Sequence, residues 1–485
     1  MFESALLPHV LSKEAYKREE PKLRKALLDA QYALRKERRF SVVVLIAGVQ
    51  GSGRGETVNL LNEWLDPRFI PTYAFGEPTQ EERERPEQWR YWRVLPPRGT
   101  IAIFFGAWHT GPILRRVKGV TSDDAFAHEI YEIARFEKML ADENVLLLKY
   151  WLHISRKHQK AHLAEAHEKA EVPYKRFVSV SEAFLRRTST AEAPWVVIPG
   201  DDRRYRSLTL GRHMLAALRE RLAAKGRSVR PARVLPLPAP ADGLNVIRAL
   251  RLNRAMPNAR YKRELEKSQA RLNRLSRDKA FRSIAAVVLF EGNDAAGKGG
   301  AIRRITSALD ARLYHTVAVA APTEEEAARP YLWRFWRHVP GRGRLTLFDR
   351  SWYGRVLVER VEGLASEPDW MRAYTEINDF EQSLARFGIA IVKFWLAISK
   401  EEQIRRFRER EKVGFKRYKI TPEDWRNRKK WDAYEQAASD MVERTSTRLA
   451  PWTLVEANNK HYARIKVLDT LCGALEHAME KAKRA

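Results

Sequence analysis

The 485 residues of this chain include a single cysteine, Cys472. One cysteine can form no disulfide within the chain and no cysteine metal cluster. Acidic residues are also scarce relative to basic ones: 61 Asp and Glu stand against 89 Lys and Arg, a formal net charge of +28. An excess of this size predicts a polyanionic partner, which could be nucleic acid, an anionic membrane surface or a phosphate polymer.

Long apolar runs are absent as well. No run reaches the ~18 residues that a membrane-spanning helix needs, and residues 1–20 lack the basic start and apolar core of a secretory signal peptide. Apolar residues make up 44% and charged residues 31% of the chain, which is typical of a globular protein with a sizeable core. We therefore expect a cytoplasmic protein with no membrane partner.

The sequence contains one long internal repeat. Residues 85–99, RPEQWRYWRVLPPRG, align at a shift of 244 with residues 329–343, RPYLWRFWRHVPGRG, and nine of these fifteen positions are identical. TSTAEAPW at 188–195 matches TSTRLAPW at 445–452 at a shift of 257, so the second copy is thirteen residues longer between about 156 and 187. Such a repeat is too long for a solenoid unit and indicates tandem domains. We predict domains at 1–227 and 251–485, joined by a Pro-rich linker at 228–250.

Each copy alternates short apolar runs with helix-like polar stretches. In the second copy the apolar runs are 284–290, 316–320, 344–349, 389–398 and 452–455. Buried strands that alternate with helices predict an α/β fold with a mainly parallel sheet flanked by helices.

A glycine-rich turn follows the first of these apolar runs. From Gly292 to Lys298 it fits G-x-x-x-x-G-K, a loop whose backbone N–H groups and lysine bind phosphate. The alternative is a strand-to-helix turn with a solvated lysine. Gly299 replaces the usual hydroxyl ligand of Mg²⁺, which makes Asp294 a candidate ligand, although a turn aspartate is the plainer interpretation. The predicted phosphate-binding residues here are Gly292, Asn293, Ala295, Ala296, Gly297 and Gly299.

The run RLTLFD ends in Asp349, a carboxylate at the carboxyl end of a strand, as in the Walker B pattern. Arg350 and Arg355 follow it and could neutralise charge on a phosphoryl group in transfer. The segment 399–434 is helical in pattern and dense in Arg and Lys. Such a segment can form a lid over the phosphates, or it can be an ordinary solvated basic helix.

The first copy lacks these chemical groups but keeps the apolar strands. Its loop reads GVQGSGRGE. The positions of Asp294, Lys298, Asp349, Arg350 and Arg355 are taken by Gln50, Arg54, Phe105, Gly106 and Gly111. We interpret the first copy as a degenerate domain without activity; a different, metal-free chemistry is the alternative.

GNDAAGKGG, FDRSWYGR, KRYK at 416–419 and APW followed by Lys460 and Arg464 resemble the polyphosphate kinase 2 family. The two copies resemble its two-domain branch. The resemblance implies two tandem P-loop kinase-like domains, the second with a basic helical lid, that transfer the terminal phosphoryl group of inorganic polyphosphate to AMP. It also implies a Mg²⁺ cofactor, GMP as an alternative acceptor and assembly into a homo-oligomer. The implied site comprises Lys298, Asp349, Arg350 and Arg355 as catalytic residues, Asp294 and Asp349 as metal ligands, and Lys416 and Arg417 as phosphate-binding lid residues.

Two other functions remain compatible with the residues. An ATP-dependent nucleoside or nucleotide kinase would share the loop but would need no extended basic surface. A non-catalytic polyanion-binding protein would fit the charge, but it would have no use for the carboxylates at Asp294 and Asp349. Because the polyphosphate chain accounts for the basic excess, we expect no nucleic-acid partner.

Overall fold

The computed structural model describes residues 1–224, 245–412, 414, 418 and 420–484. The chain divides into two compact units. The first comprises Met1–Thr79, Arg90–Val229 and Pro322–Trp333, and the second comprises Gln80–Trp89, Arg230–Ala321 and Arg334–Ala485. The predicted linker at 228–250 falls largely on 225–244, outside the described residues, so the predicted domain boundaries stay a prediction. In the described part of the chain, every helix is too short or too polar to span a bilayer.

The first unit is built on a five-stranded sheet in the order β2-β3-β1-β4-β5, with every neighbouring pair parallel. Its strands are β1 (Ser41–Gly48), β2 (Thr72–Ala74), β3 (Ile101–Phe105), β4 (Val145–His153) and β5 (Trp195–Pro199). The helices in this stretch of the chain are α1 (Lys13–Glu37), α2 (Arg54–Trp64), α3 (Gln80–Arg83), α4 (Trp89–Trp92), α5 (Thr110–Val117), α6 (Asp123–Asp142), α7 (Arg156–Glu165), α8 (Tyr174–Thr188) and α9 (Arg203–Ala223).

The second unit repeats this sheet in the order β7-β8-β6-β9-β10, again fully parallel. Its strands are β6 (Ala285–Gly292), β7 (Tyr314–Ala318), β8 (Leu345–Asp349), β9 (Ile389–Ala397) and β10 (Trp452–Glu456). The longer helices in this stretch of the chain are α10 (Asn258–Arg277), α11 (Lys298–Thr306), α15 (Glu367–Phe387), α16 (Lys400–Glu411), α18 (Pro422–Lys429), α19 (Trp431–Thr445) and α20 (Lys460–Arg484). The short ones are α12 (Glu324–Ala327), which belongs to the first unit, α13 (Trp333–Trp336) and α14 (Val358–Val361). The predicted α/β fold with two parallel sheets is confirmed.

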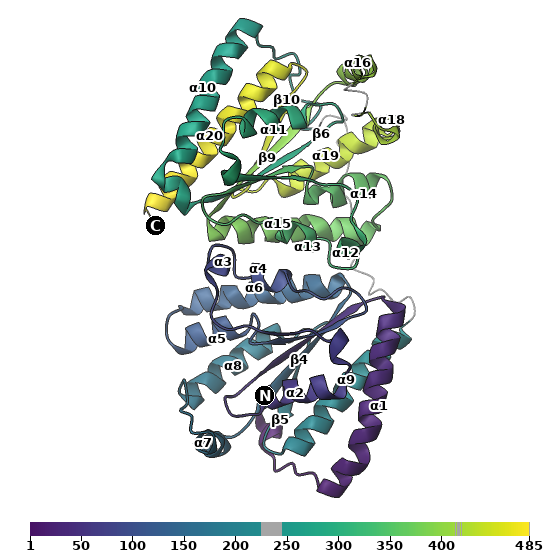
Figure 1. The fold of residues 1–485 in the computed structure, drawn as a ribbon, viewed down its shortest axis with the longest axis vertical. Coiled ribbons are helices and arrows are strands. Elements are labelled where there is room, and N and C mark those ends of the chain that lie inside the picture. Colours follow the sequence, from purple (N-terminus) through teal and green to yellow (C-terminus); the bar gives the residue numbers. More distant parts are fainter. Residues whose placement is uncertain (225–244, 413, 415–417, 419, 485) are drawn as a thin grey trace. The chain divides into compact units, whose positions relative to one another are not determined.

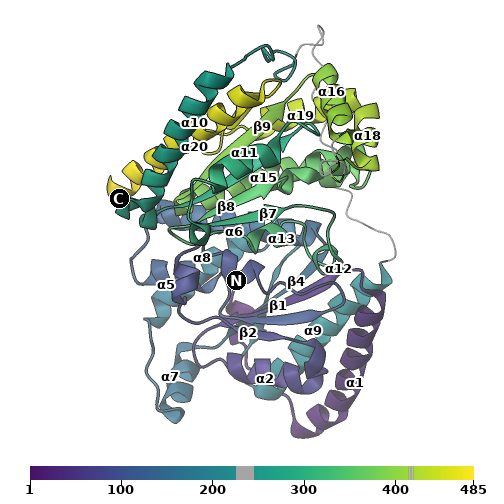
Figure 2. The ribbon, with the colours of Figure 1, turned by 45° about the horizontal axis from the view of Figure 1, so that its top comes forward.

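Helices cover both faces of the second sheet. On one face α10 and α20 lie side by side with α11, as both ribbon views show (Figures 1 and 2). Ala286, Val288 and Phe290 of β6 pack there against Leu468 and Leu471 of α20. Helix α15 contacts β9 on the other face. A sheet covered on both faces needs strands that are apolar at every position, which explains the continuous apolar run at β6.

A buried ion pair joins β9 to α15. Lys393 Nζ lies 2.7 Å from Glu381 Oε2 and also donates to the Tyr353 hydroxyl at 2.8 Å. The first unit carries the same pair, Lys149 Nζ to Glu137 Oε2 at 2.6 Å. Because this pair persists in the copy that has lost the proposed catalytic groups, we infer that it supports the fold rather than the chemistry.

We expect Lys393→Met to lower the free energy of unfolding of the second unit by about 3–5 kcal/mol, because Glu381 would be left buried without its counter-charge. Guanidinium chloride unfolding measures this change, and Lys279→Met, at an exposed lysine, serves as the control. The double variant Lys393→Met/Glu381→Gln should recover much of the loss, since it removes both charges. An unchanged unfolding midpoint for Lys393→Met would contradict the structural role of the pair.

The predicted basic helical segment at 399–434 is confirmed as helical, but it is divided. Helices α16 and α18 and the first turn of α19 occupy it. Ser399 caps α16, because its Oγ accepts a hydrogen bond from the backbone N–H of Glu402. Lys416 and Arg417, the predicted lid residues, lie outside the described residues, and their roles stay predictions.

Candidate active site

The loop between β6 and α11 lies at the centre of the sheet edge where the strands end. Lys298 begins α11, and its Nζ donates to the backbone oxygen of Gly292 at 2.7 Å. Asn293 ties the loop to the end of β9, since its Oδ1 accepts from the Ile398 N–H at 3.1 Å. The Lys298 ammonium therefore donates to neutral backbone carbonyls of the loop. A phosphate oxygen is charged and would be a stronger hydrogen-bond acceptor than these carbonyls.

Two non-glycine residues at this edge adopt left-handed backbone conformations: Ala295 with φ 64° and Arg350 with φ 63°. Each such residue costs about 1–2 kcal/mol and persists where the surroundings hold it. The aligned positions of the first unit are Gly51 and Gly106, which adopt φ 83° and 74° without a Cβ penalty. The second unit therefore keeps side chains at strained positions, as is typical of functional sites.

The two predicted metal ligands both reach the loop. Asp349 ends β8, the strand that pairs directly with β6, and a Cβ on Gly299 would lie 3.7 Å from Asp349 Oδ2. Asp294 Oδ1 lies 3.4 Å from Arg350 Nη2, and its Oδ2 accepts from Asn427 Nδ2 at 2.9 Å. The pairing of β8 with β6 and the contact with Asn427 of α18 thus place two carboxylates and one guanidinium around the loop.

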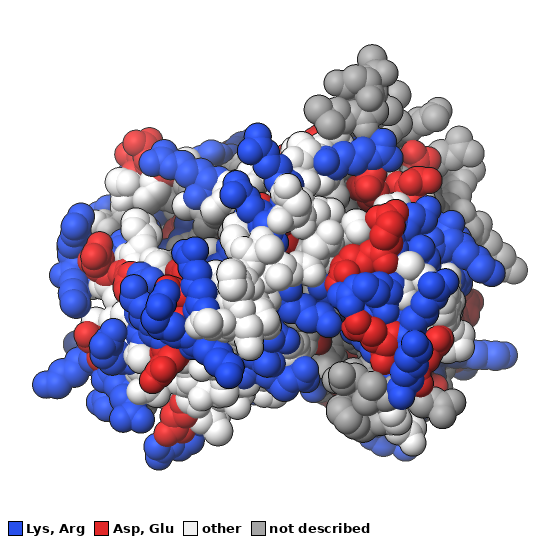
Figure 3. Space-filling view, turned by 90° about the horizontal axis from the view of Figure 1, so that it is seen from above, with Lys and Arg blue, Asp and Glu red and all other residues white. Residues whose placement is uncertain are grey.

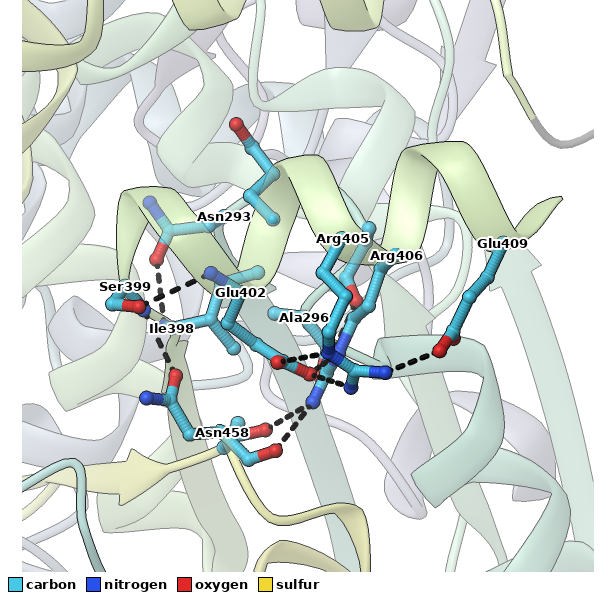
Figure 4. A network of polar contacts seen from close by, with 12 residues as sticks. Asn293, Ala296, Ile398, Ser399, Glu402, Arg405, Arg406, Glu409 and Asn458 are labelled. Carbon is cyan, nitrogen blue, oxygen red and sulfur yellow. Dashed lines mark hydrogen bonds and ion pairs between the residues drawn. The ribbon is translucent and has the colours of Figure 1, made fainter. Parts of the chain in front are cut away.

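Arg406 of α16 fastens the loop to the end of β10 (Figure 4). Its side chain is buried, and Nη1 donates to the backbone oxygens of Ala295 and Ala296, both at 2.9 Å. Nη2 donates to the oxygens of Ala457 and Asn458 at 2.6 and 2.9 Å. The sequence analysis did not identify Arg406, because nothing in the sequence distinguishes it from the other arginines of the basic segment 399–434.

Glu291 is a second residue that sequence reasoning missed. It is the last residue before Gly292 in β6, is buried, and accepts a hydrogen bond from Ser351 Oγ at 2.8 Å. Burial raises the pKa of Glu291, and the nearby charge of Lys298 acts in the opposite direction. The only sequence signal is an acidic residue inside an apolar strand.

The loop opens into a cavity of about 600 Å³. Burial, followed by the charge of Arg406, lowers the pKa of Lys460, which also lines this cavity. A positive field of this kind favours anions such as phosphates. The cationic side chains in the lining are Lys298, Arg303, Arg350, Arg406, Arg410, Lys460 and Arg464, and the carboxylates are Asp294, Asp349, Glu409 and Asp424.

A second cavity of about 80 Å³ adjoins the first. Asp294, Lys298 and Arg350 line both cavities. The remaining lining of the small cavity includes the apolar and aromatic residues Leu357, Val358, Trp395, Trp431 and Tyr434, together with the polar residues Glu291, Asn293, Gln403 and Asn427. Asp294, Lys298 and Arg350 therefore lie between a large cavity with many cationic side chains and a small cavity with aromatic side chains.

Most of the predicted site residues come together at these two cavities. Asp294, Lys298, Asp349 and Arg350 do so, together with the loop residues Gly292, Asn293, Ala295, Ala296, Gly297 and Gly299. Arg355 does not: it lines neither cavity, and its Nε lies 2.7 Å from Glu359 Oε2. Arg303 and Arg410 line the large cavity without having been predicted, whereas Lys460 and Arg464 belong to a motif that the sequence analysis had noted.

The sequence model of one protein family, described as Polyphosphate kinase 2 (PPK2), matches residues 10–226 and 255–483. The chain belongs to the polyphosphate kinase 2 family. The two matched regions correspond to the two copies of the internal repeat, so each copy is a polyphosphate kinase 2 repeat.

Two curated relatives align with this chain over the whole length of both proteins. A polyphosphate:AMP phosphotransferase of Pseudomonas aeruginosa is 52% identical, with all of both chains covered. A polyphosphate:AMP phosphotransferase of Pseudomonas syringae pv. tomato is 49% identical over the same extent. A crystal structure titled as a putative polyphosphate kinase 2 from P. aeruginosa superposes with a TM-score of 0.91 at 52% identity, covering 99% of this chain and 100% of that one.

In the first polyphosphate kinase 2 repeat an arginine from α9 fills the space beside the loop. A Cβ on Gly53 would lie 2.3 Å from Arg206 Nη1, whereas a Cβ on the aligned Gly297 would meet nothing within 4 Å. Arg206 donates to the backbone oxygen of Ser52 at 3.1 Å and pairs with Glu56 Oε2 at 2.6 Å. The first repeat thus holds an internal ion pair at the place where the second repeat is open to a ligand.

Proposed function

We propose that this protein transfers the terminal phosphoryl group of inorganic polyphosphate to AMP, giving ADP. The observation that carries this proposal is the pair of adjoining cavities in the second unit, which share Asp294, Lys298 and Arg350. Full-length relatives with the name polyphosphate:AMP phosphotransferase support the same reaction.

We assign the large cavity to the polyphosphate donor. A phosphate chain carries about one negative charge per phosphate, so it matches a space lined by seven cationic side chains. Lys and Arg are also spread across the outer face of the protein that Figure 3 shows, with Asp and Glu in smaller groups between them. An ATP-dependent kinase would need only the cluster at the loop.

We assign the small cavity to the AMP acceptor. Trp395, Trp431 and Tyr434 offer the apolar and aromatic surface that a nucleoside favours. The AMP phosphate would lie at the shared residues, next to the terminal phosphate of the donor. Lys298 and Arg350 would then bind and orient both phosphates and stabilise the negative charge that spreads over the transferred group. The AMP phosphate is already ionised near neutral pH, so the reaction needs no strong general base.

We propose Asp294 and Asp349 as the residues that would hold Mg²⁺. Within the described residues no group of three or more His, Cys, Asp or Glu could form a protein cage for a metal. Two carboxylates beside a phosphate cavity fit Mg²⁺, which is usually bound by one or two carboxylates together with phosphates and water. When bound, Mg²⁺ supplies charge neutralisation at the phosphate oxygens.

ADP formation from AMP, with either long-chain polyphosphate or ATP as the sole donor, tests the proposed function. We expect turnover with polyphosphate and Mg²⁺, little with ATP, and loss of turnover with excess EDTA. At low polyphosphate concentration the rate should also fall steeply with salt, because polyanion binding releases counterions. Turnover with ATP alone would contradict the donor assignment. GMP in place of AMP tests the alternative acceptor, and sedimentation velocity tests the expected homo-oligomer.

A further inference from the structure

The first unit contains a cavity of about 120 Å³ at the place that corresponds to the acceptor cavity of the second unit. The correspondence is residue by residue at the shift of 244. Gln50, Arg54, Trp151 and Gln159 line this cavity, and they align with Asp294, Lys298, Trp395 and Gln403 of the acceptor cavity. The degenerate unit has therefore kept a space where its catalytic groups have changed.

One buried polar atom faces this cavity without a hydrogen-bond partner among the described residues. His109 is buried, with 4% of its surface exposed, and its Nδ1 makes no hydrogen bond. Burial lowers the pKa of His109 to about 3, so its imidazole is neutral at physiological pH. The Arg54 guanidinium also lines the cavity, where it lies over the Phe105 ring, 5.8 Å from the ring centroid, and interacts electrostatically with the Glu171 carboxylate of the same lining. Because buried polar groups in native proteins are nearly always hydrogen-bonded, the unpaired Nδ1 of His109 indicates a ligand.

The wall of the cavity is held in place by the loop. Gln50 Nε2 donates to the backbone oxygen of Lys169 at 3.2 Å, and its Oε1 accepts from the Glu171 N–H at 3.0 Å. Glu171 and the neighbouring Val172 are part of the lining, together with Phe177 of α8. The glutamine that replaces the proposed metal ligand Asp294 thus fastens the chain after α7 over the cavity.

We propose that this cavity binds one nucleoside monophosphate and does not turn it over. Arg54 supplies the guanidinium that a phosphate group needs, and Trp151 and Phe177 supply aromatic surface for the base. The phosphoryl donor has no place beside it, because the Arg206 guanidinium fills the loop and Phe105 stands where the second unit has Asp349. The inference rests on the proposed function, since it extends the acceptor assignment to the first unit.

Calorimetric titration of the full-length protein with AMP, without polyphosphate and without Mg²⁺, tests this inference. We expect two AMP molecules per chain. Arg54→Met should weaken one site at least ~10-fold, because charge-assisted hydrogen bonds to the phosphate are lost, and Arg54→Lys should restore part of the binding. The matched variant Lys298→Met should weaken the other site. Val172→Trp, which fills the cavity from a different wall, should abolish the same site as Arg54→Met.

The outcomes separate this inference from the proposed function. A single AMP per chain that is lost in Lys298→Met and kept in Arg54→Met and Val172→Trp would overturn the inference and leave the proposed function intact. A single AMP that is lost only in Arg54→Met and Val172→Trp would support the nucleotide site and contradict the acceptor assignment in the second unit. If Arg54→Met lowers the melting temperature, Val172→Trp decides between these outcomes.

Discussion

Lys298→Ala is expected to lower the rate of ADP formation from polyphosphate and AMP at least ~100-fold. The Lys298 ammonium lines both cavities and donates to the Gly292 backbone oxygen of the loop at 2.7 Å. A preorganised charge at the transferred group commonly contributes this much to the rate. The steady-state rate at saturating polyphosphate and AMP measures the effect, so that weaker substrate binding does not mask the loss in the chemical step.

Arg304→Ala is the matched control for this experiment. Arg304 lies two turns or less from Lys298 on the same helix, α11, but lines neither cavity. We expect this variant to keep a rate close to that of the wild type. A near-normal rate for Lys298→Ala would contradict the assignment of the loop lysine, whereas equal losses in both variants would indicate damage to the helix.

Asp349→Asn is expected to cause a loss of similar size, at least ~100-fold in rate, because an amide keeps the shape of the carboxylate and removes its charge. Asp349 lies beside the loop residue Gly299 at the end of β8. The Mg²⁺ dependence of the rate distinguishes its role. If Asp349 holds the ion, the variant should need a higher Mg²⁺ concentration for half-maximal rate.

Asp310→Asn, at an aspartate that pairs with Arg312 away from both cavities, serves as the control. It should change neither the rate nor the Mg²⁺ requirement. An unchanged rate for Asp349→Asn would remove this carboxylate from the proposed chemistry. A lower rate with an unchanged Mg²⁺ requirement would leave it a role in positioning the acceptor rather than in holding the metal.

The loop residues could be predicted because their geometry is local. Gly292 to Lys298 are contiguous, and a strand before them and a helix after them suffice to turn their N–H groups inward. Asp349 could be predicted for a related reason, since parallel strands bring their carboxyl ends to one edge of the sheet. Its neighbour Arg350 follows at once in the chain and needed no further information.

Residues selected by packing could not be predicted. Arg405 and Arg406 are adjacent in one basic helix, yet only Arg406 is buried against the loop, while Arg405 pairs with Glu402 and Glu409 at the surface. Arg355 is a different case, and its predicted catalytic role stays a prediction. It follows the Walker B aspartate closely in the sequence, but in the structure it pairs with Glu359 and lines neither cavity.

The sequence by itself determined the two repeats, the parallel α/β fold and the phosphate loop, because each of these follows from local patterns and from the comparison of one copy with the other. Only the tertiary structure decided which distant groups meet the loop. Arg406 reaches the second loop from α16, more than a hundred residues further along the chain, and Arg206 fills the first loop from α9. Contacts between residues so far apart depend on how helices pack over the sheet edge, and a one-dimensional pattern does not contain that information.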